Sequence, residues 1–326
     1  MRIFVAGATG ALGERLVPML VSAGHHVVGM TRTETKTGEL RAAGAEPVVA
    51  DALDRKQVMD RVIACRPDVV VHELTAIARM PNLKKWDREF APTNRLRTAG
   101  TDILLAAARA AGAQRFVAQS FAGWPFERTG GQVKSEEAPL DPNPPDAMKQ
   151  TLDAIRRLEQ TVSSAPNLNS LVLRYGGFYG PGTSVSADGD ATRMVRKRQF
   201  PIFGAGTGVW SFLHIDDAAN ATRLAIEGGP AGIYNIVDDE PAEVSVWLPE
   251  FARAIRAKPP YRLPEWLGRL LIGEAGLSVM NQVRGASNAK AKRLLGWSPT
   301  YATWRDGFRR GLSAQPPNPV SQPATF

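Results

Sequence analysis

The sequence is poor in the residues that build disulfides and metal centres. Its one cysteine, Cys65, cannot form a disulfide within the chain. The four histidines are scattered along the chain and form no cluster with the ligand spacing of a zinc site. These absences exclude a disulfide-stabilised secreted scaffold and a structural zinc protein, and we expect no bound metal.

Long apolar runs and extended basic tracts are also missing. No segment approaches the ~20 consecutive apolar residues of a membrane-spanning helix, and the chain enters an apolar strand at once, with no signal-peptide pattern. We therefore expect a cytoplasmic protein without a membrane partner. The net charge of +8 favours anionic ligands, but the densest basic cluster, Arg196 to Arg198, is only three residues long. This surface favours a phosphorylated small molecule over nucleic acid.

The 326 residues do contain the alternation of a layered α/β protein. Short runs rich in β-branched residues alternate with longer segments of helical period, which predicts βαβ units and a mostly parallel sheet. The predicted strands are Ile3–Ala6, Val27–Met30, Pro47–Ala50, Asp68–His72, Arg115–Gln119, Ser170–Arg174, Phe212–Ile215 and Gly232–Val237. The predicted helices include a segment with a stripe of Leu12, Leu16 and Leu20, and the segments Gly100–Ala111 and Thr151–Val162.

The strongest local motif lies between the first predicted strand and the first helix. It reads Gly7-Ala8-Thr9-Gly10-Ala11-Leu12-Gly13, with the glycines spaced as GxxGxxG. A diphosphate needs backbone N–H groups and a helix N-terminus, and it approaches closely only where side chains are missing. The loop therefore indicates that a dinucleotide binds along Gly7, Thr9, Gly10, Ala11, Leu12 and Gly13. A tight turn with close helix–sheet packing would explain the same glycines, and this alternative stays open.

The residues after the second strand bear on which dinucleotide binds. An acidic residue there would bond a free ribose 2′-hydroxyl, whereas Thr31-Arg32-Thr33 offers a cation and two hydroxyls, which suit a 2′-phosphate. We therefore expect NADP as the cofactor, with NAD as the alternative, and Arg32 as the phosphate-binding residue. An ordinary solvent-exposed arginine is the other explanation of Arg32.

Several further segments recur in an order and spacing that point to a known family. They are Asp51-Ala52-Leu53-Asp54, Pro67 to His72, Asn94 with Gly100-Thr101, Arg174 to Gly182, Phe212 to Asp217, Tyr234 to Ile236 and Leu295 to Pro299. From Arg2 to about Leu312 the chain thus resembles an extended short-chain dehydrogenase/reductase of the epimerase/dehydratase branch. The resemblance implies a Rossmann-type doubly wound parallel sheet with a smaller C-terminal substrate-binding lobe.

The texture of the sequence changes near residue 176, where loops rich in glycine and proline begin. We expect an NAD(P)-binding domain over residues 1–175 and a substrate-binding lobe over residues 176–312, with the chain crossing back at about residues 210–240. Residues 313–326 contain four prolines and no charge, which predicts a flexible tail.

The resemblance also implies which residues border the cofactor. Beyond the glycine loop and Arg32, these residues are Asp51, Ala52, Leu74, Thr75, Ala76, Asn94, Gly177 and Phe178. Asp51 is implied to contact the adenine, although a turn-forming or helix-capping carboxylate is the alternative. His214 is implied to support the fold rather than to take part in catalysis.

The catalytic pair of the family is missing. Family members use a tyrosine and a lysine four residues later, but all five tyrosines here lie at or beyond Tyr175 and none has a lysine at that spacing. Aligning Glu159 with a frequent family glutamate puts Thr151 at the tyrosine position and Ile155 at the lysine position. A threonine hydroxyl is a far weaker acid than a phenol, and isoleucine has no charge. The resemblance therefore implies a non-standard acid–base set, in which we include Thr151.

Two other polar residues are candidates at the same site. Aligning Trp124-Pro125 with the usual Tyr-Gly pair puts Ser120 at the position of the family's substrate-polarising hydroxyl, and we predict it to be catalytic. A strand-end serine bonded to its own backbone is the alternative. Glu73 stands where the family has an apolar residue. We expect it to face solvent in an ion pair, and a buried acid or base with a raised pKa is the alternative.

Trp210 bears on the substrate. Relatives that act on sugar nucleotides often carry a diphosphate-binding arginine at this position, whereas an indole stacks on flat or apolar molecules. Packing between the lobes would also explain Trp210. We therefore expect an NADP(H)-dependent oxidoreductase or epimerase/dehydratase-like enzyme that acts on a small apolar or aromatic carbonyl or alcohol. The alternatives are a non-catalytic NADP(H) sensor and a redox-neutral isomerase, lyase or cyclase. The family resemblance also predicts a homodimer through the helices at 100–111 and 151–162.

Overall fold

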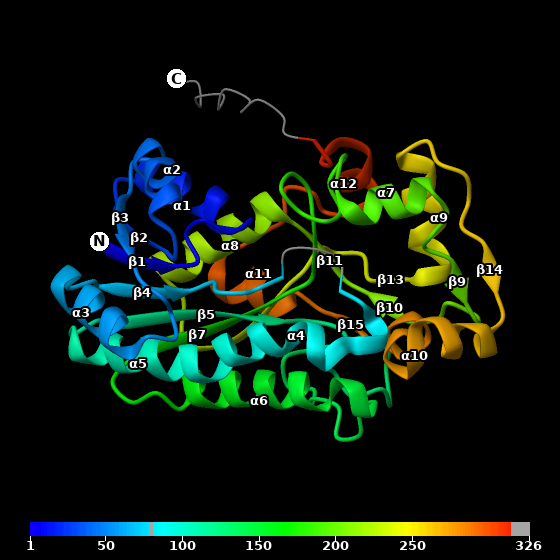
Figure 1. Ribbon diagram of the computed structural model, residues 1–326, viewed down its shortest axis with the longest axis horizontal. Helices are drawn as coiled ribbons and strands as arrows, with labels where there is room; N and C mark the ends of the chain where they lie inside the picture. The colour runs from blue at the N-terminus through cyan, green and yellow to red at the C-terminus, as the bar shows by residue number, and fades with distance from the viewer. Residues whose placement is uncertain (78–80, 314–326) are drawn as a thin grey trace.

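A seven-stranded parallel sheet organises the chain (Figure 1). The computed structural model describes residues 1–77 and 81–313. The strand order is β12-β7-β5-β4-β1-β2-β3, and each neighbouring pair runs parallel. The predicted α/β class and doubly wound sheet are confirmed. The strands of this sheet are β1 (Arg2–Ala6), β2 (His26–Thr31), β3 (Glu46–Val49), β4 (Val69–His72), β5 (Arg115–Phe121), β7 (Asn169–Tyr175) and β12 (Gly232–Ile236).

Helices cover both faces of the sheet because the strands present apolar side chains to both. In β1, Ile3 and Val5 point into one core, and Phe4 and Ala6 point into the other. The first core includes residues of α1 (Gly13–Ser22), α2 (Thr37–Ala42), α8 (Ile215–Glu227) and α11 (Ala289–Leu295). The second includes residues of α3 (Arg55–Cys65), α5 (Thr101–Ala110) and α6 (Lys149–Ser163). The predicted leucine stripe of α1 is buried in the first core.

The two strands predicted beyond residue 210 lie in different sheets. The strand expected at residues 212–215 is β11 (Phe212–His214), which pairs with β8 (Gly177–Tyr179) outside the central sheet. The strand expected at 232–237 is β12, which pairs with β7 at the end of the sheet. The chain therefore returns to the central sheet after β11, while the domain division at residue 175 stays a prediction.

A third apolar core lies in the C-terminal part of the chain. It gathers aromatic side chains, among them Trp247, Phe251, Trp304 and Phe308. The helices here are α7 (Asp190–Arg196), α9 (Val244–Ala254), α10 (Glu265–Asn281) and α12 (Trp304–Arg310). Short strands accompany them and pair in twos: β6 (Val133–Lys134), β9 (Ile202–Phe203), β10 (Val209–Trp210), β13 (Ala242–Glu243), β14 (Arg262–Leu263) and β15 (Gly285–Ala286). The tail expected from residue 313 lies, from residue 314 onward, outside the described residues.

One irregular helix positions the candidate site. Helix α4 (Trp86–Arg95) continues through a π-helical turn, η3 (Leu96–Gly100), into α5. A π turn carries an extra residue and shifts the direction of the side chains around it. Within this turn Arg97 points inward and is buried. The remaining short helices are η1 (Glu34–Lys36), η2 (Leu83–Lys85) and η4 (Asp146–Met148).

None of the helices in the described part of the chain has both the length and the apolar character that crossing a membrane requires. The exposed side of α5 and α6 carries an ion pair between Asp102 and Arg157, whose charged atoms lie 2.7 Å apart. The homodimer expected through these two helices stays a prediction.

Candidate functional site

The glycine loop joins β1 to α1 at the carboxyl edge of the sheet. Gly7 has φ +99°, and a Cβ there would lie 2.5 Å from the carbonyl oxygen of Glu73. A Cβ on Gly13 would lie 2.3 Å from the carbonyl oxygen of Gly7. Backbone conformation and close packing therefore require both glycines.

Gly10 differs from the other two glycines. It is exposed, and a Cβ there would meet only the Gly7 carbonyl oxygen, at 3.4 Å. The fold itself does not need a glycine at this position. A missing side chain at the N-terminal end of α1 leaves the backbone open, as close approach of a diphosphate requires. The loop thus fits a dinucleotide better than the packing alternative, which accounts for Gly7 and Gly13 alone.

One cation contacts this loop, and another follows β2 directly. Arg32 directly follows β2, is exposed, and makes no ion pair with the described residues. The ammonium of Lys36, in η1, donates to the carbonyl oxygen of Thr9 at 3.4 Å. Lys36 is thus tied to the cofactor loop itself. Sequence reasoning missed this residue, although its place one helical turn after Arg32 was a usable signal.

Asp51 combines an exposed position with a local structural role. Its Oδ1 accepts from the backbone N–H of Leu53 at 3.0 Å, which closes a short turn, and Ala52 beside it is buried. The turn-forming alternative is therefore realised for one oxygen of Asp51. Its contact with adenine stays a prediction.

The end of β4 leads to the segment expected along the cofactor. Leu74 is half-buried, whereas Thr75 and Ala76 are exposed, and the Ala76 N–H donates to the Thr93 hydroxyl at 3.1 Å. The Leu74 N–H donates to Nδ1 of His72 at 3.3 Å. Burial lowers the pKa of His72 to about 4, so the ring is neutral and Nδ1 is free to accept. His72 fixes the chain here as a structural residue.

Thr151 lies at the base of the site with its hydroxyl fully engaged. Its Oγ1 donates to Oδ1 of Asp87 at 2.6 Å and accepts from Nδ2 of Asn94 at 3.1 Å. The Asp87 carboxylate also accepts the backbone N–H groups of Gln150 and Thr151, at 3.0 and 2.9 Å. Asp87 therefore caps the first turn of α6, and the Thr151 proton points at a carboxylate. Thr151 is 0% exposed.

Ser120, at the end of β5, belongs to a buried ionic network. Its hydroxyl donates to Oε1 of Glu159 at 2.7 Å. Arg174 grips the same carboxylate with two hydrogen bonds, from Nε at 2.8 Å and from Nη2 at 2.6 Å. All three side chains are buried. The Ser120 oxygen thus keeps its lone pairs for a ligand but not its proton, and Glu159 is a site residue that sequence reasoning used only for alignment.

Glu73 is buried and has no ion pair with the described residues, so the expectation of a solvent-facing ion pair is wrong. The Tyr175 hydroxyl donates to its Oε1 at 3.0 Å, and Oε2 has no hydrogen-bond partner among the described residues. The physical reason is register: Glu73 continues the alternation of Val69 and Val71, which point into the first core. Burial raises its pKa to about 8, so the carboxyl is mainly protonated at neutral pH.

Apolar side chains gather next to Thr151. Trp86 adjoins Asp87 in the chain, stacks on Phe90 with ring centroids 4.9 Å apart, and meets the edge of Trp124 at 5.1 Å. Met148 packs in the same group. We call Trp86, Phe90, Trp124 and Met148 the tryptophan cluster. Beside it is an open hollow of about 570 Å³ lined by Arg128, Asn143, Pro144, Pro145, Asp146, Ala147, Glu274 and Gln282.

Trp210 packs between elements of the C-terminal part. Its Nε1 donates to the carbonyl oxygen of Val279 in α10 at 2.9 Å, and its ring lies 4.8 Å from that of Trp247 in α9. The packing alternative therefore accounts for Trp210. Gly177 and Phe178 form β8 beside it in the fold, and their contact with the cofactor stays a prediction.

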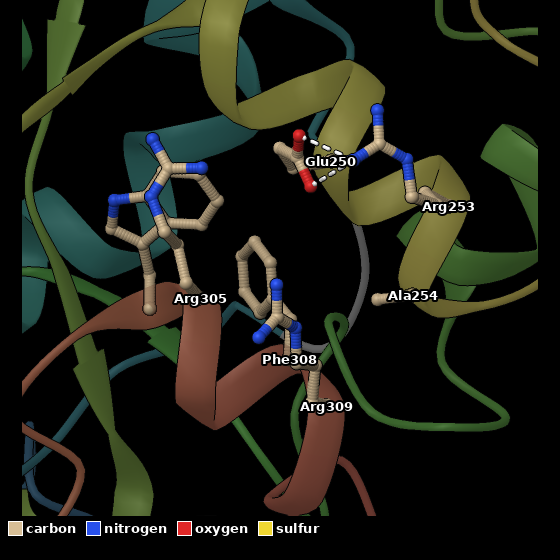
Figure 2. Close-up of a pocket in the computed structure, with 7 residues that line it drawn as sticks. Glu250, Arg253, Ala254, Arg305, Phe308 and Arg309 are labelled. Atoms are coloured by element: carbon tan, nitrogen blue, oxygen red, sulfur yellow. Dashed lines mark hydrogen bonds and ion pairs between the residues drawn. The ribbon is translucent and has the colours of Figure 1, made fainter.

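Figure 2 shows a smaller pocket, of about 210 Å³, between α9 and α12. Its lining residues are Glu250, Arg253, Ala254, Trp304, Arg305, Phe308 and Arg309. Glu250 accepts two hydrogen bonds from Arg253, at 2.8 and 3.0 Å, as the dashed lines in Figure 2 mark. Sequence reasoning missed this pocket because its residues come from helices far apart in the chain. None of the predicted site residues lines it.

Comparison with known proteins agrees with this geometry. Residues 3–237 match the profile of the NAD dependent epimerase/dehydratase family. The chain is 44% identical over 311 residues to the 3-diazoavenalumate denitrifying reductase of a Streptomyces species, covering 95% of this chain and 100% of the relative. It is 29% identical over 251 residues, 76% of this chain and 71% of the relative, to the 4-hydroxy-2-methyl-3-oxo-4-farnesyl-3,4-dihydroquinoline-1-oxide ketoreductase of Stigmatella aurantiaca. Its fold is similar to that of a human epimerase family protein solved with NADPH, with a TM-score of 0.75, 18% identity, and coverage of 96% of this chain and 99% of the other.

Proposed function

The chain belongs to the NAD dependent epimerase/dehydratase family as an enzyme of the oxidoreductase or epimerase type, and on this premise we propose that it reduces small aromatic substrates by replacing a diazo group with hydrogen. The reductant is a nicotinamide cofactor. The proposal rests on the site of Thr151 and draws support from the relative that is named a denitrifying reductase.

The carrying observation is the absence of a phenol acid at the position of Thr151. Reducing a carbonyl leaves charge on oxygen, which a positioned acid must neutralise with a proton. The Thr151 proton is directed at Asp87 instead, and no lysine follows one turn later, where Ile155 stands. An aryl diazonium group makes no such demand, because its leaving group is neutral dinitrogen. A site in which position 151 offers the substrate no proton is thus sufficient for this reaction and poorly suited to carbonyl reduction.

The residues that would hold the cofactor are those of the glycine loop, Arg32 and Lys36. The open backbone at Gly10 would hold the diphosphate, and Arg32 and Lys36 would supply positive charge to the adenosine half of the cofactor. We propose NADP over NAD because both charges complement a 2′-phosphate and residue 32 is not acidic. When bound, the nicotinamide supplies a hydride, so that an aryl diazonium ion and NADPH give the arene, dinitrogen and NADP⁺.

The substrate class follows from the side chains around Thr151 and Ser120. Trp124 is the partly exposed member of the tryptophan cluster, whose other three side chains are buried, and its indole favours a planar aromatic ring over a sugar. Ser120 keeps two acceptor lone pairs while its proton stays with Glu159. It therefore binds a donor group of the substrate and does not polarise a carbonyl.

A second candidate is the reduction of a carbonyl, the activity expected from the sequence. Glu73 favours it, because burial keeps this carboxyl protonated up to a pKa of about 8 and it stands at the end of β4, below the glycine loop. The ketoreductase relative is consistent with it. In this candidate Glu73, rather than Thr151, would supply the proton.

Turnover assays separate the two candidates. The purified protein is given NADPH or NADH with the diazonium salt of 3-amino-4-hydroxybenzoic acid carrying a ¹⁵N label, or with a panel of aromatic ketones. The proposal predicts NADPH oxidation matched by release of labelled dinitrogen, and little turnover of ketones. Ketone turnover that is lost in Glu73→Gln would support the second candidate, and turnover of neither class would overturn both. Gly10→Asp is the control, because a Cβ has room there while a carboxylate repels the diphosphate.

A further inference from the structure

Arg97 is a buried cation with no carboxylate at ion-pair distance among the described residues. Its side chain lies in the π turn η3 and the residue is 8% exposed. It makes no ion pair with the described residues, and its one hydrogen bond is a long one, from Nη1 to Oδ1 of Asn94 at 3.4 Å. Arg174, which is also buried, donates two hydrogen bonds to the carboxylate of Glu159. An unpaired buried charge is costly, and proteins retain it chiefly where a ligand completes it.

The surroundings of Arg97 place its guanidinium across one face of α6. Thr151, Ile155 and Glu159 follow one another at intervals of four residues and therefore share this face. Arg97 is joined to Thr151 through Asn94. Burial lowers the pKa of Arg97. The negative charge of Glu159 raises it by a smaller amount. The hydrogen bonds through Asn94 thus place Arg97 on the side of α6 that carries Thr151, and Ile155 lies one turn further along the same face.

Arg97 also lies close to the end of β4, because Nε2 of His72 lies 3.3 Å from the carbonyl oxygen of the preceding residue, Leu96. Its charge contributes to the lowered pKa of His72, after the dominant effect of burial. His72 fixes the start of the segment Leu74 to Ala76, along which the cofactor is expected to lie. The cation therefore stands between α6 and the cofactor edge of the sheet.

We propose that Arg97 supplies from η3 the positive charge that position 155 lacks, and that it binds the ribose hydroxyls next to the nicotinamide. A guanidinium has five donors in a fixed plane and suits two neighbouring hydroxyls. Burial leaves its pKa at about 10, so it stays charged at neutral pH and does not exchange protons as a lysine would. This inference concerns the nicotinamide cofactor and does not depend on which substrate is reduced.

Binding measurements test this assignment without turnover. Calorimetry compares the whole dinucleotide, NADPH, with its adenylate half, 2′,5′-ADP, which lacks the second ribose. Arg97→Met is expected to weaken NADPH binding by about tenfold or more, since a charge-assisted hydrogen bond is lost, and to leave 2′,5′-ADP binding unchanged. Arg95→Met, at an exposed arginine two residues away, is the matched control and should change neither. If the wild-type protein binds NADH more tightly than NADPH, the same comparison is made with NADH in place of NADPH and AMP in place of 2′,5′-ADP.

Three results would overturn the proposed role of Arg97. NADPH binding that is unchanged in Arg97→Met overturns the proposal, and so does an equal loss for both ligands, which would show a purely structural role. If circular dichroism shows Arg97→Met unfolded, Arg97→Lys carries the test. It keeps the charge on a shorter, differently shaped group and should weaken NADPH binding by about threefold while leaving 2′,5′-ADP binding intact. Unaltered NADPH binding in a folded Arg97→Lys then contradicts the proposal.

Discussion

The hydroxyl of Thr151 donates to the carboxylate of Asp87 across 2.6 Å, at the position that the family resemblance aligns with a catalytic tyrosine. A proton held in this way contributes to the cap of α6, and the catalytic role of Thr151 stays a prediction. The chemistry proposed for the site follows from this relationship, because a reduction that expels dinitrogen needs no acid.

Thr151→Val is expected to destabilise the protein without abolishing activity. Removing the hydroxyl leaves Asp87 and Asn94 each short of one partner, which should lower the free energy of unfolding by about 1–3 kcal/mol. Turnover of the diazonium substrate should stay within about threefold of wild type, because no transition-state interaction is lost. Urea unfolding and kcat measure the two effects. A folded Thr151→Val that has lost activity, with Thr151→Ser still active, would show instead that the hydroxyl takes part in the reaction.

Breaking the buried ion pair of Glu159 with Arg174 is expected to cost far more stability than breaking a surface pair on the same helix. Glu159→Gln leaves a buried guanidinium uncompensated and should lower the free energy of unfolding by about 3–5 kcal/mol. Asp153→Asn is the control, because its pair with Arg156, at 2.8 Å, is solvent-exposed and should contribute about 0–1 kcal/mol. Equal effects of the two substitutions on urea unfolding would refute this ranking.

Glu73 is expected to make stability fall as the pH rises. Its carboxyl has a pKa of about 8 in the folded chain, against an ordinary value of 4.5, so the folded state holds the proton more tightly. The contribution of this proton to the free energy of unfolding is complete below pH 4.5. It is lost progressively as the pH rises from 4.5 to 8. The free energy of unfolding of Glu73→Gln relative to wild type should therefore rise by a few kcal/mol from pH 5 to pH 8, on the order set by the shift. A difference that does not vary with pH would place the Glu73 pKa near its ordinary value.

Arg32 and Lys36 are expected to decide the choice between NADPH and NADH. Arg32→Gln combined with Lys36→Gln should weaken NADPH binding by about tenfold or more and change NADH binding little, because only the 2′-phosphate loses its cations. Arg61→Gln, at an exposed arginine on α3, is the control for net charge. Calorimetric titration with both dinucleotides makes the comparison. A parallel loss of both affinities would show that these residues do not read the 2′-position.

The architecture could be predicted from local patterns, but the contacts of the site could not. Alternating runs such as Ile3–Ala6 and the stripe of Leu16 and Leu20 report burial directly, and the sheet and α1 follow from them. Asp87, the hydrogen-bond acceptor of Thr151, lies 64 residues away on α4. No local sequence pattern predicts a contact over that separation. Arg97 is hidden for a similar reason, since a π turn rather than an ordinary helix directs it inward.

The burial of Glu73 follows from the alternation of its strand and not from its residue type. A glutamate at a strand end suggests a solvated ion pair, yet the alternation of Val69 and Val71 carries Glu73 into the core beside Tyr175. Extending the period of the strand by one step would have found it. Trp210 is a milder case: its type allowed both stacking on a ligand and packing, and only the bond to Val279 distinguishes them.

The fate of the hydride tests the account most directly. The protein is incubated with the diazonium substrate and NADPH that carries deuterium at the transferable position of the nicotinamide, in ordinary water, and the arene is examined by mass spectrometry. Direct hydride transfer should put one deuterium on the ring carbon that had borne nitrogen, and no ring deuterium should appear when unlabelled NADPH is used in heavy water. An arene whose new hydrogen comes from solvent, or formation at the same rate without the protein, would contradict it.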